Sequence, residues 1–113
     1  MFRMEIGNAI RFLRKQKGYT QSQLADFSHT TKSTISNLES GHQSYSAALL
    51  QHLSKALDCP ISKIFLIAEH MAEDGSAPEW DKLPVEVLFD ELSRDAQTIV
   101  KKLMQQMVIE RER

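Results

Sequence analysis

The sequence predicts an all-α protein, and two patterns support this. Apolar residues recur at intervals of three and four along most of the chain, which is the spacing of one helix face. No alternating run of β-branched or aromatic residues is long enough for a strand. A chain of 113 residues is long enough for one compact domain and an appendage. The periodic segments described below predict a five-helix domain followed by a helical segment.

The first two expected helices have recognisable ends. The first ends near Gly18 and has an inner face of Ile6, Ile10 and Leu13. Thr20 and Gln23 then have the spacing of a capping box, in which each side chain satisfies a backbone N–H group at the start of the second helix. The buried side of that helix is expected to be Leu24 with either Phe27 or Ala25.

The next three helices follow the same logic. Thr31 caps a third helix that ends at Gly41 and turns Ile35 and Leu38 inward. Ser46 starts a fourth helix, with an inner face of Ala47, Leu50, Leu53, Ala56 and Leu57. Pro60 stops it. A fifth helix carries Ile61, Ile64, Phe65 and Ala68.

The stretch EDGSAPEW has the composition of a linker. We therefore expect a first domain over 1–72, a linker over 73–83 and a helical segment over 84–113, with Trp80 as a packing anchor. Pro84 suits the first position of a short helix, and Ser93 caps a longer one that runs to about Glu110.

Charge and composition narrow the functions. Residues 1–66 contain eight Lys and Arg against four Asp and Glu, a net charge of +4, whereas residues 67–113 have a net charge of −5. Such an asymmetry is typical of a chain whose first half meets a polyanion, although charge also fluctuates by chance. Cys59 is expected to be a core residue. We expect no metal, no cofactor, no membrane span and, without a secretory signal, a place in the cytoplasm.

The third helix has an unusual outer face. On a helical wheel Ser33, Ser36, Asn37 and Ser40 gather opposite the buried side. Each such residue costs a helix up to about 0.7 kcal/mol relative to alanine, so stability alone does not favour them. Short side chains that donate and accept hydrogen bonds suit a helix that approaches base edges in the major groove. The alternative is a surface helix that drifted to these residues.

Three stretches, IGNAIRFLRKQKGYTQSQLA, TTKSTISNLESG and LLQHLSKALDCPISKIF, together resemble the phage repressor and Cro type of helix-turn-helix domain, found in the xenobiotic-response-element family of regulators. The resemblance runs from Ile6 to Phe65. It implies a five-helix fold with a positioning helix over 21–27 and a recognition helix over 32–40. No cofactor is implied, and the implied partner is double-stranded DNA.

The resemblance also assigns roles to single residues. It assigns to Gln21 a phosphate contact, with a base contact as the alternative, and base reading to Lys32, Ser33 and Asn37. It assigns phosphate or secondary contacts to Thr31, Thr34 and Ser36. It places the loop His42, Gln43, Ser44 and Tyr45 at the DNA backbone. It pairs Arg14 with Glu39 as an internal ion pair.

Two residues depart from the family pattern. His29 stands where glycine is frequent in the turn, at a site that favours a positive φ, and Asp58 stands where glycine is frequent at the end of the fourth helix. The loop HQSY also lacks the basic residues often found there, so we expect weaker phosphate attraction at that loop.

The C-terminal helix has a broad apolar stripe, which indicates a contact surface. We expect it to pair with a second copy through Leu92, Ala96, Ile99, Val100, Leu103, Met104 and Met107. The alternative is that it folds back on the first domain.

The leading hypothesis is a dimeric repressor that binds a palindromic operator. The second is a protein-interaction module, antitoxin-like or anti-regulator, that binds a protein partner through 84–113. An enzyme is the weakest hypothesis because no nucleophile, acid and base, or phosphate-binding loop is recognisable.

Overall fold

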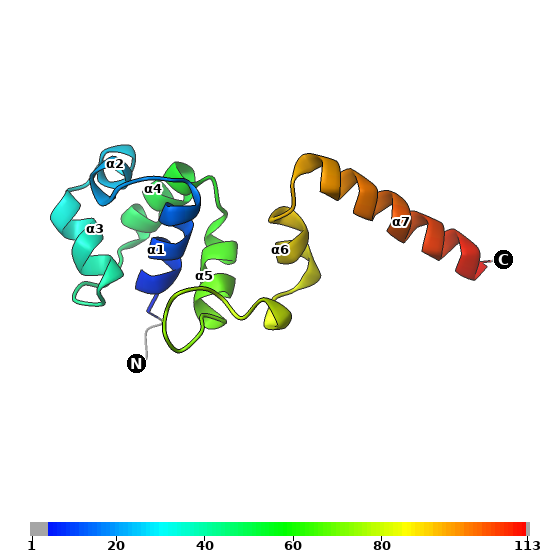
Figure 1. The fold of residues 1–113 in the computed structure, drawn as a ribbon. Helices are drawn as coiled ribbons and strands as arrows, with labels where there is room; N and C mark the ends of the chain where they lie inside the picture. The colour runs from blue at the N-terminus through cyan, green and yellow to red at the C-terminus, as the bar shows by residue number, and fades with distance from the viewer. Residues whose placement is uncertain (1–4, 113) are drawn as a thin grey trace. The chain divides into compact units, whose positions relative to one another are not determined.

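The structure, a computed structural model, describes residues 5–112 as helices joined by short connections (Figure 1). Among these residues there is no strand, and one isolated antiparallel bridge joins Met71 and Pro78. The expectation of an all-α fold is confirmed. The helices are α1 (Gly7–Gln16), α2 (Gln21–Phe27), α3 (Lys32–Glu39), α4 (Ala47–Leu57), α5 (Ile61–Glu69), α6 (Val85–Asp90) and α7 (Arg94–Glu112), with a 3₁₀ helix at Trp80–Lys82.

Four of these helices begin at side-chain caps that the sequence predicts. Thr20 and Gln23 form a complete capping box at α2, with hydrogen bonds of 3.0 and 2.9 Å. Thr31 and Ser46 each accept a backbone N–H at 3.1 Å at the starts of α3 and α4, and Ser93 accepts one at 3.2 Å at α7. Each cap satisfies an N–H group that a helix start leaves without a partner.

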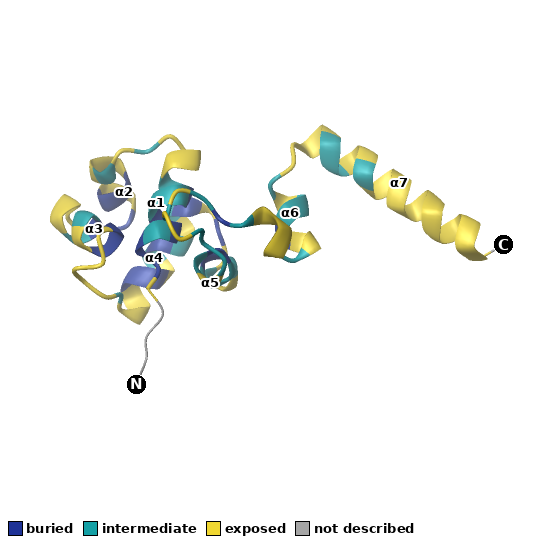
Figure 2. Cartoon of the chain, turned by 60° about the horizontal axis from the view of Figure 1, so that its bottom comes forward, coloured by how far each residue is buried: buried dark blue, intermediate teal, exposed yellow. Residues whose placement is uncertain are grey.

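Helices α1 to α5 share one core (Figure 2). Each contributes an almost completely buried side chain, namely Ile10, Leu24, Ile35, Leu53 and Ile64. Burying an aliphatic side chain of this size stabilises the fold by about 1.5–3 kcal/mol. This core therefore fixes the relative positions of α2 and α3.

Some side chains settle alternatives that the sequence leaves open. Ala25 is buried, whereas Phe27 is 52% exposed and rests against the Tyr19 ring at 5.0 Å between centroids. Ala25 is therefore the inward partner of Leu24. Cys59 is buried, which confirms its expected place in the core.

Glu39, the last residue of α3, joins that helix to α1 through a buried ion pair. Its side chain has no exposed surface, and that of Arg14 is 11% exposed. Arg14 donates through Nε to Oε2 at 2.7 Å and through Nη2 to Oε1 at 3.1 Å. It also donates through Nη1 to the Tyr19 carbonyl at 2.9 Å. The two residues that the family resemblance pairs thus form a bidentate contact, which holds both groups in fixed orientations.

The first of two compact units extends to Lys82 and so includes nearly all of the segment expected as a linker, residues 73–83. The boundary between the two units lies between Lys82 and Leu83. Backbone hydrogen bonds close this segment: Ala72 donates to Ala77 at 2.9 Å, and Glu79 donates to His70 at 2.7 Å. The Trp80 ring packs edge-on against Phe12 of α1, with centroids 5.7 Å apart. These contacts explain why a linker-like composition does not give a free linker here.

The second unit, residues 83–113, consists of α6 and α7. Pro84, expected as the first residue of α6, is instead its N-cap. Gln97 joins the two helices by donating through Nε2 to the Phe89 carbonyl at 2.9 Å. No described residue of α7 is buried. Among the residues that the structure describes, no helix is both long enough and apolar enough to cross a membrane.

We predict that Glu39→Gln lowers the free energy of unfolding by about 3 kcal/mol or more, because it leaves the Arg14 guanidinium buried beside an uncharged group. The matched control is Glu79→Gln, which breaks the exposed ion pair of 2.7 Å between Glu79 and Lys82. Exposed pairs contribute less than about 1 kcal/mol. Urea unfolding followed by circular dichroism measures both changes, and equal losses in the two variants would contradict the role given to Glu39.

Candidate nucleic-acid interface

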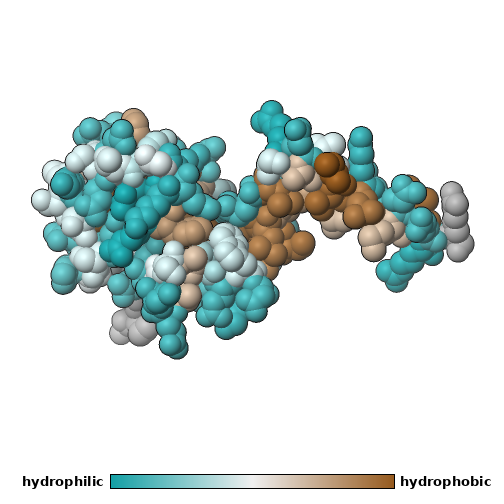
Figure 3. Space-filling view, in the orientation of Figure 1, coloured by the Kyte–Doolittle hydropathy of each residue, from teal (hydrophilic) through white to brown (hydrophobic). Residues whose placement is uncertain are grey.

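The outer face of α3 carries polar side chains that are exposed to solvent. Lys32, Ser33 and Asn37 are exposed, whereas Thr34 and Ser36 are half-buried. The surface over α3 is white to teal in Figure 3, which marks polar residues. Ile35 and Leu38, on the opposite side, are almost fully buried. The helix is therefore fixed by its apolar side and presents its polar side to solvent.

Both threonines at the start of α3 are engaged in the cap of that helix. Thr31 accepts the Thr34 N–H, and the two hydroxyl oxygens lie 3.0 Å apart in a hydrogen bond. Thr31 is exposed. Since a hydroxyl both donates and accepts, this cap leaves capacity for one further partner on the exposed side.

Glu39 also holds Gln21, the first residue of α2. Gln21 donates through Nε2 to Oε1 of Glu39 at 3.2 Å. A carboxylate only accepts, so the contact fixes which end of the glutamine amide faces the acid. The amide has a second N–H and a carbonyl oxygen beyond this bond. Gln21 is half-buried, so it lies at the edge between the core and the surface.

Arg11 is a further partner of Glu39 that the sequence reasoning missed. Its Nε lies 3.5 Å from Oε1, and its Nη2 donates to the Glu39 carbonyl at 3.3 Å. The Arg11 side chain is 40% exposed. The signal was the spacing of Arg11 and Arg14, because residues three apart lie on the same face of a helix. Two arginines therefore neutralise the single acid of α3.

The loop after α3 is built on the Asn37 backbone. The Asn37 carbonyl accepts hydrogen bonds from the N–H groups of His42 at 2.9 Å and Gln43 at 3.2 Å, and from the Ser40 hydroxyl at 3.2 Å. Nδ1 of His42 lies 2.9 Å from that same hydroxyl. Because none of these bonds uses the amide side chain of Asn37, the loop does not depend on that side chain.

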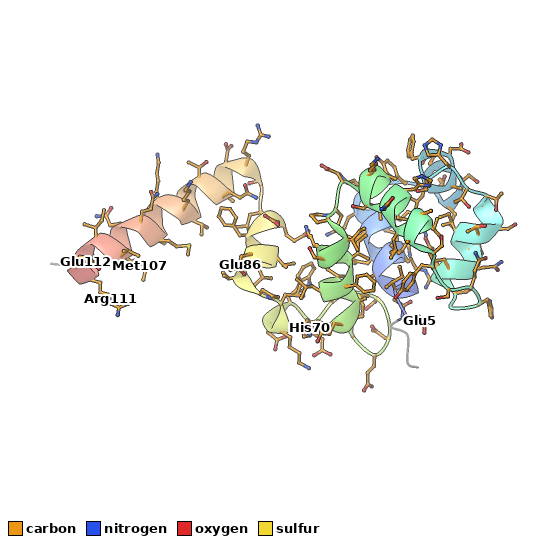
Figure 4. The ribbon with its side chains drawn as sticks, turned by 180° about the vertical axis from the view of Figure 1, so that it is seen from behind. Glu5, His70, Glu86, Met107, Arg111 and Glu112 are labelled. Carbon is orange, nitrogen blue, oxygen red and sulfur yellow. The ribbon has the colours of Figure 1, made fainter. Side chains whose placement is uncertain are left out.

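The rest of the loop divides into an open part and an anchored part. His42, Gln43 and Ser44 are exposed. Tyr45 is half-buried, and its ring packs edge-on against Phe65 of α5 with centroids 5.7 Å apart. Tyr45 therefore anchors the loop to the core. The Glu5 side chain lies against Gly41 at the start of the loop, where it adds a negative charge; Glu5 itself is labelled in Figure 4.

The second unit has a surface of different character. An open groove of about 1050 Å³ between α6 and α7 is lined mainly by Val85, Leu88, Phe89, Leu92, Val100, Met104, Val108 and Ile109. Brown, hydrophobic residues gather there in Figure 3. Of the residues expected to pair with a second copy, Ala96 and Val100 are half-buried and the other five, Leu92, Ile99, Leu103, Met104 and Met107, are exposed. Among the described residues, no group of three His, Cys, Asp or Glu side chains is arranged to hold a metal ion.

Comparisons with known proteins agree with this arrangement. A model of the helix-turn-helix family matches residues 10–64. Over 102 residues the chain is 53% identical to the competence pilus inhibition repressor of Acinetobacter baylyi, covering 89% of this chain and 93% of that protein. It is 37% identical over 81 residues to the HTH-type transcriptional regulator SinR of Bacillus subtilis, covering 69% of this chain and 72% of SinR.

A solved structure gives the same result. The crystal structure of the clp gene regulator ClgR from C. glutamicum superposes with a TM-score of 0.57 at 31% identity, covering 65% of this chain and 96% of that one. The chain therefore belongs to the helix-turn-helix family of DNA-binding transcriptional regulators.

Proposed function

We propose that the chain is a repressor that binds a palindromic operator as a homodimer in the cytoplasm. The observation that carries this is the state of α3: it exposes Lys32, Ser33 and Asn37, and its one acid, Glu39, is buried between two arginines. A helix held in this way enters a groove without exposing a negative charge to phosphate. Because members of this family are DNA-binding regulators rather than enzymes, the enzyme hypothesis is set aside.

Asn37, Ser33 and Lys32 read base edges in this proposal. The Asn37 amide pairs with adenine N6 and N7, the Ser33 hydroxyl suits several bases, and Lys32 donates to guanine. Thr31, Thr34 and Ser36 serve as phosphate or secondary contacts around them.

Gln21 and the loop after α3 position the protein on the backbone. The part of the Gln21 amide that Glu39 does not use is available for a phosphate oxygen. His42, Gln43 and Ser44 add contacts from the open part of the loop, with Tyr45 as its anchor. The absence of Lys or Arg from residues 42–45 favours weaker phosphate attraction here than at Lys32.

A homodimer is supported by the apolar surface of the second unit. Ile99, Leu103 and Met107 are at least 60% exposed, and Met107 stands out from α7 (Figure 4). Large exposed apolar patches on a soluble protein usually mark a contact with another chain. Pairing through α7 would give the assembly two copies of α3, and dimers of this kind bind half-sites that are one helical turn, about 34 Å, or a multiple of it apart.

A protein partner is the second candidate for this surface. The groove between α6 and α7 is lined mainly by apolar residues, and Glu86, Asp90, Lys101 and Gln105 also line it. An apolar groove of this form can accept a helix of another protein. In that case residues 84–113 bind a partner protein that regulates the chain. The two candidates differ in the oligomeric state of the purified chain, which is a dimer only in the first.

Selection of bound duplexes from a random pool tests the proposed function. We expect enrichment of a two-fold symmetric sequence, with a logarithm of affinity that falls linearly with the logarithm of salt concentration. Failure to enrich any sequence over the input pool would reject sequence-specific binding and favour the partner-binding candidate.

We predict that Asn37→Ala reduces discrimination between the selected duplex and its variants at one base position by about 1–3 kcal/mol, because one bidentate contact is lost. The fold is expected to stay intact, since the loop uses only the Asn37 main chain. Gln51→Ala, on the exposed side of α4, is the control. An equal loss of affinity on every duplex tested would argue against base reading.

We predict that Leu103→Asp converts the dimer to a monomer, because a charge then replaces an apolar side chain in the interface. Thr98→Asp adds the same charge to an exposed position on the polar side of α7 and should leave the dimer intact. Sedimentation velocity measures the mass of each variant. A wild-type chain that is already monomeric at micromolar concentration would refute pairing through α7.

A further inference from the structure

The turn between α2 and α3 has an unusual conformation. His29 has a φ of +55°, in the left-handed region that glycine occupies readily and residues with a Cβ adopt at a cost. Ser28, beside it, is fully buried, and its hydroxyl is without a hydrogen-bond partner among the described residues. The turn therefore has two unfavourable features, one in its backbone and one in a side chain.

His29 makes a contact that joins this turn to α4. Its ring packs edge-on against the ring of His52, with centroids 5.2 Å apart and planes at 73°. Aromatic rings in this arrangement attract each other beyond the burial of their area. His52 is half-buried, and the next residue along α4, Leu53, is fully buried in the core. The His52 ring is thus mounted on a fixed helix, whereas His29 is exposed on a turn.

This turn leads directly into α3, whose inner side is also held by the core. Thr31, the cap of α3, is only two residues after His29. The backbone bonds that close the turn are His29 N–H to Asp26 at 3.3 Å and Thr30 N–H to Ala25 at 3.0 Å. A binding site loses function when its supporting residues let it move by about 1 Å. A contact that holds the turn in place therefore helps to set where Ser33 meets a base.

We propose that His52 is a positioning residue for DNA recognition: its ring holds His29 in the left-handed conformation and so fixes the start of α3. The inference rests on the proposed role of α3 in base reading. It differs from the roles given to Gln21 and Asn37, because His52 acts through another residue and does not itself touch DNA.

A cycle of substitutions in the full chain tests the contact without DNA. His52→Ala should lower the melting temperature when His29 is present, because the turn then keeps its strained backbone and loses the ring contact that supports it. The same substitution should have much less effect in a His29→Gly background, because glycine adopts a φ of +55° without help. Thermal unfolding measures the four chains, and an equal effect of His52→Ala in both backgrounds would overturn the proposed contact.

The same four chains test positioning on DNA, with the selected duplex and a scrambled duplex of equal length as probes. His52→Ala should lower affinity for the selected duplex by up to about tenfold, since the turn can transmit no more than the ring contact contributes, and leave affinity for the scrambled duplex unchanged. His52→Phe keeps a ring and should restore selective binding. Gln51→Ala is the control on α4.

Each result on DNA supports or overturns the inference. Parallel losses on both duplexes, or no rescue by phenylalanine, would show that His52 is merely structural. If neither duplex is preferred by the wild-type chain, base reading by α3 fails as a whole, and the unfolding cycle still reports whether the two rings are coupled.

Discussion

The buried carboxylate of Glu39 is the constraint on which the rest of this domain depends. It accepts hydrogen bonds from Arg14 of α1 and Gln21 of α2 while standing at the end of α3, so three helices meet at one side chain. A buried ion pair of this kind contributes less to net stability than to fixing one arrangement, because removing two charges from water is costly. The α3 helix is short, and its polar outer face does not favour a helix; its position is therefore set by tertiary contacts. The same carboxylate orients Gln21, which connects the scaffold directly to the surface proposed to meet DNA.

Much of this fold can be predicted from the sequence because capping residues close to each helix start mark where the helix begins. Thr20, Thr31, Ser46 and Ser93 each cap the helix that they were expected to cap, since a capping bond involves residues only two or three apart. Contacts between distant residues are less visible. The exposure of Phe27 and the packing of Trp80 on Phe12 depend on which surfaces meet in space. A composition typical of linkers could not show that this segment is closed by backbone bonds or that Trp80 packs on Phe12 of α1.

The candidate site shows the same division. The outward position of Ser33 and Asn37 follows from helical period, and the structure leaves both exposed. The hydrogen bond from Gln21 to Glu39, the approach of Arg11 to Glu39 and the contact of His29 with His52 each join residues that are far apart in the sequence. Of these, only Arg11 had a local signal, its spacing from Arg14. The effect of these contacts is to hold a polar helix face in one place. The second unit differs, because α7 leaves apolar side chains exposed.

The most direct test of the account is to follow the backbone amide signals of the isotopically labelled chain by nuclear magnetic resonance as the selected duplex is added. The account predicts that the largest shifts fall on α3 between Lys32 and Asn37, on Gln21 and on the loop 42–44, with contacts from the Ser33 and Asn37 side chains to base protons. Shifts concentrated on α6 and α7, with the signals of α3 unchanged, would contradict it.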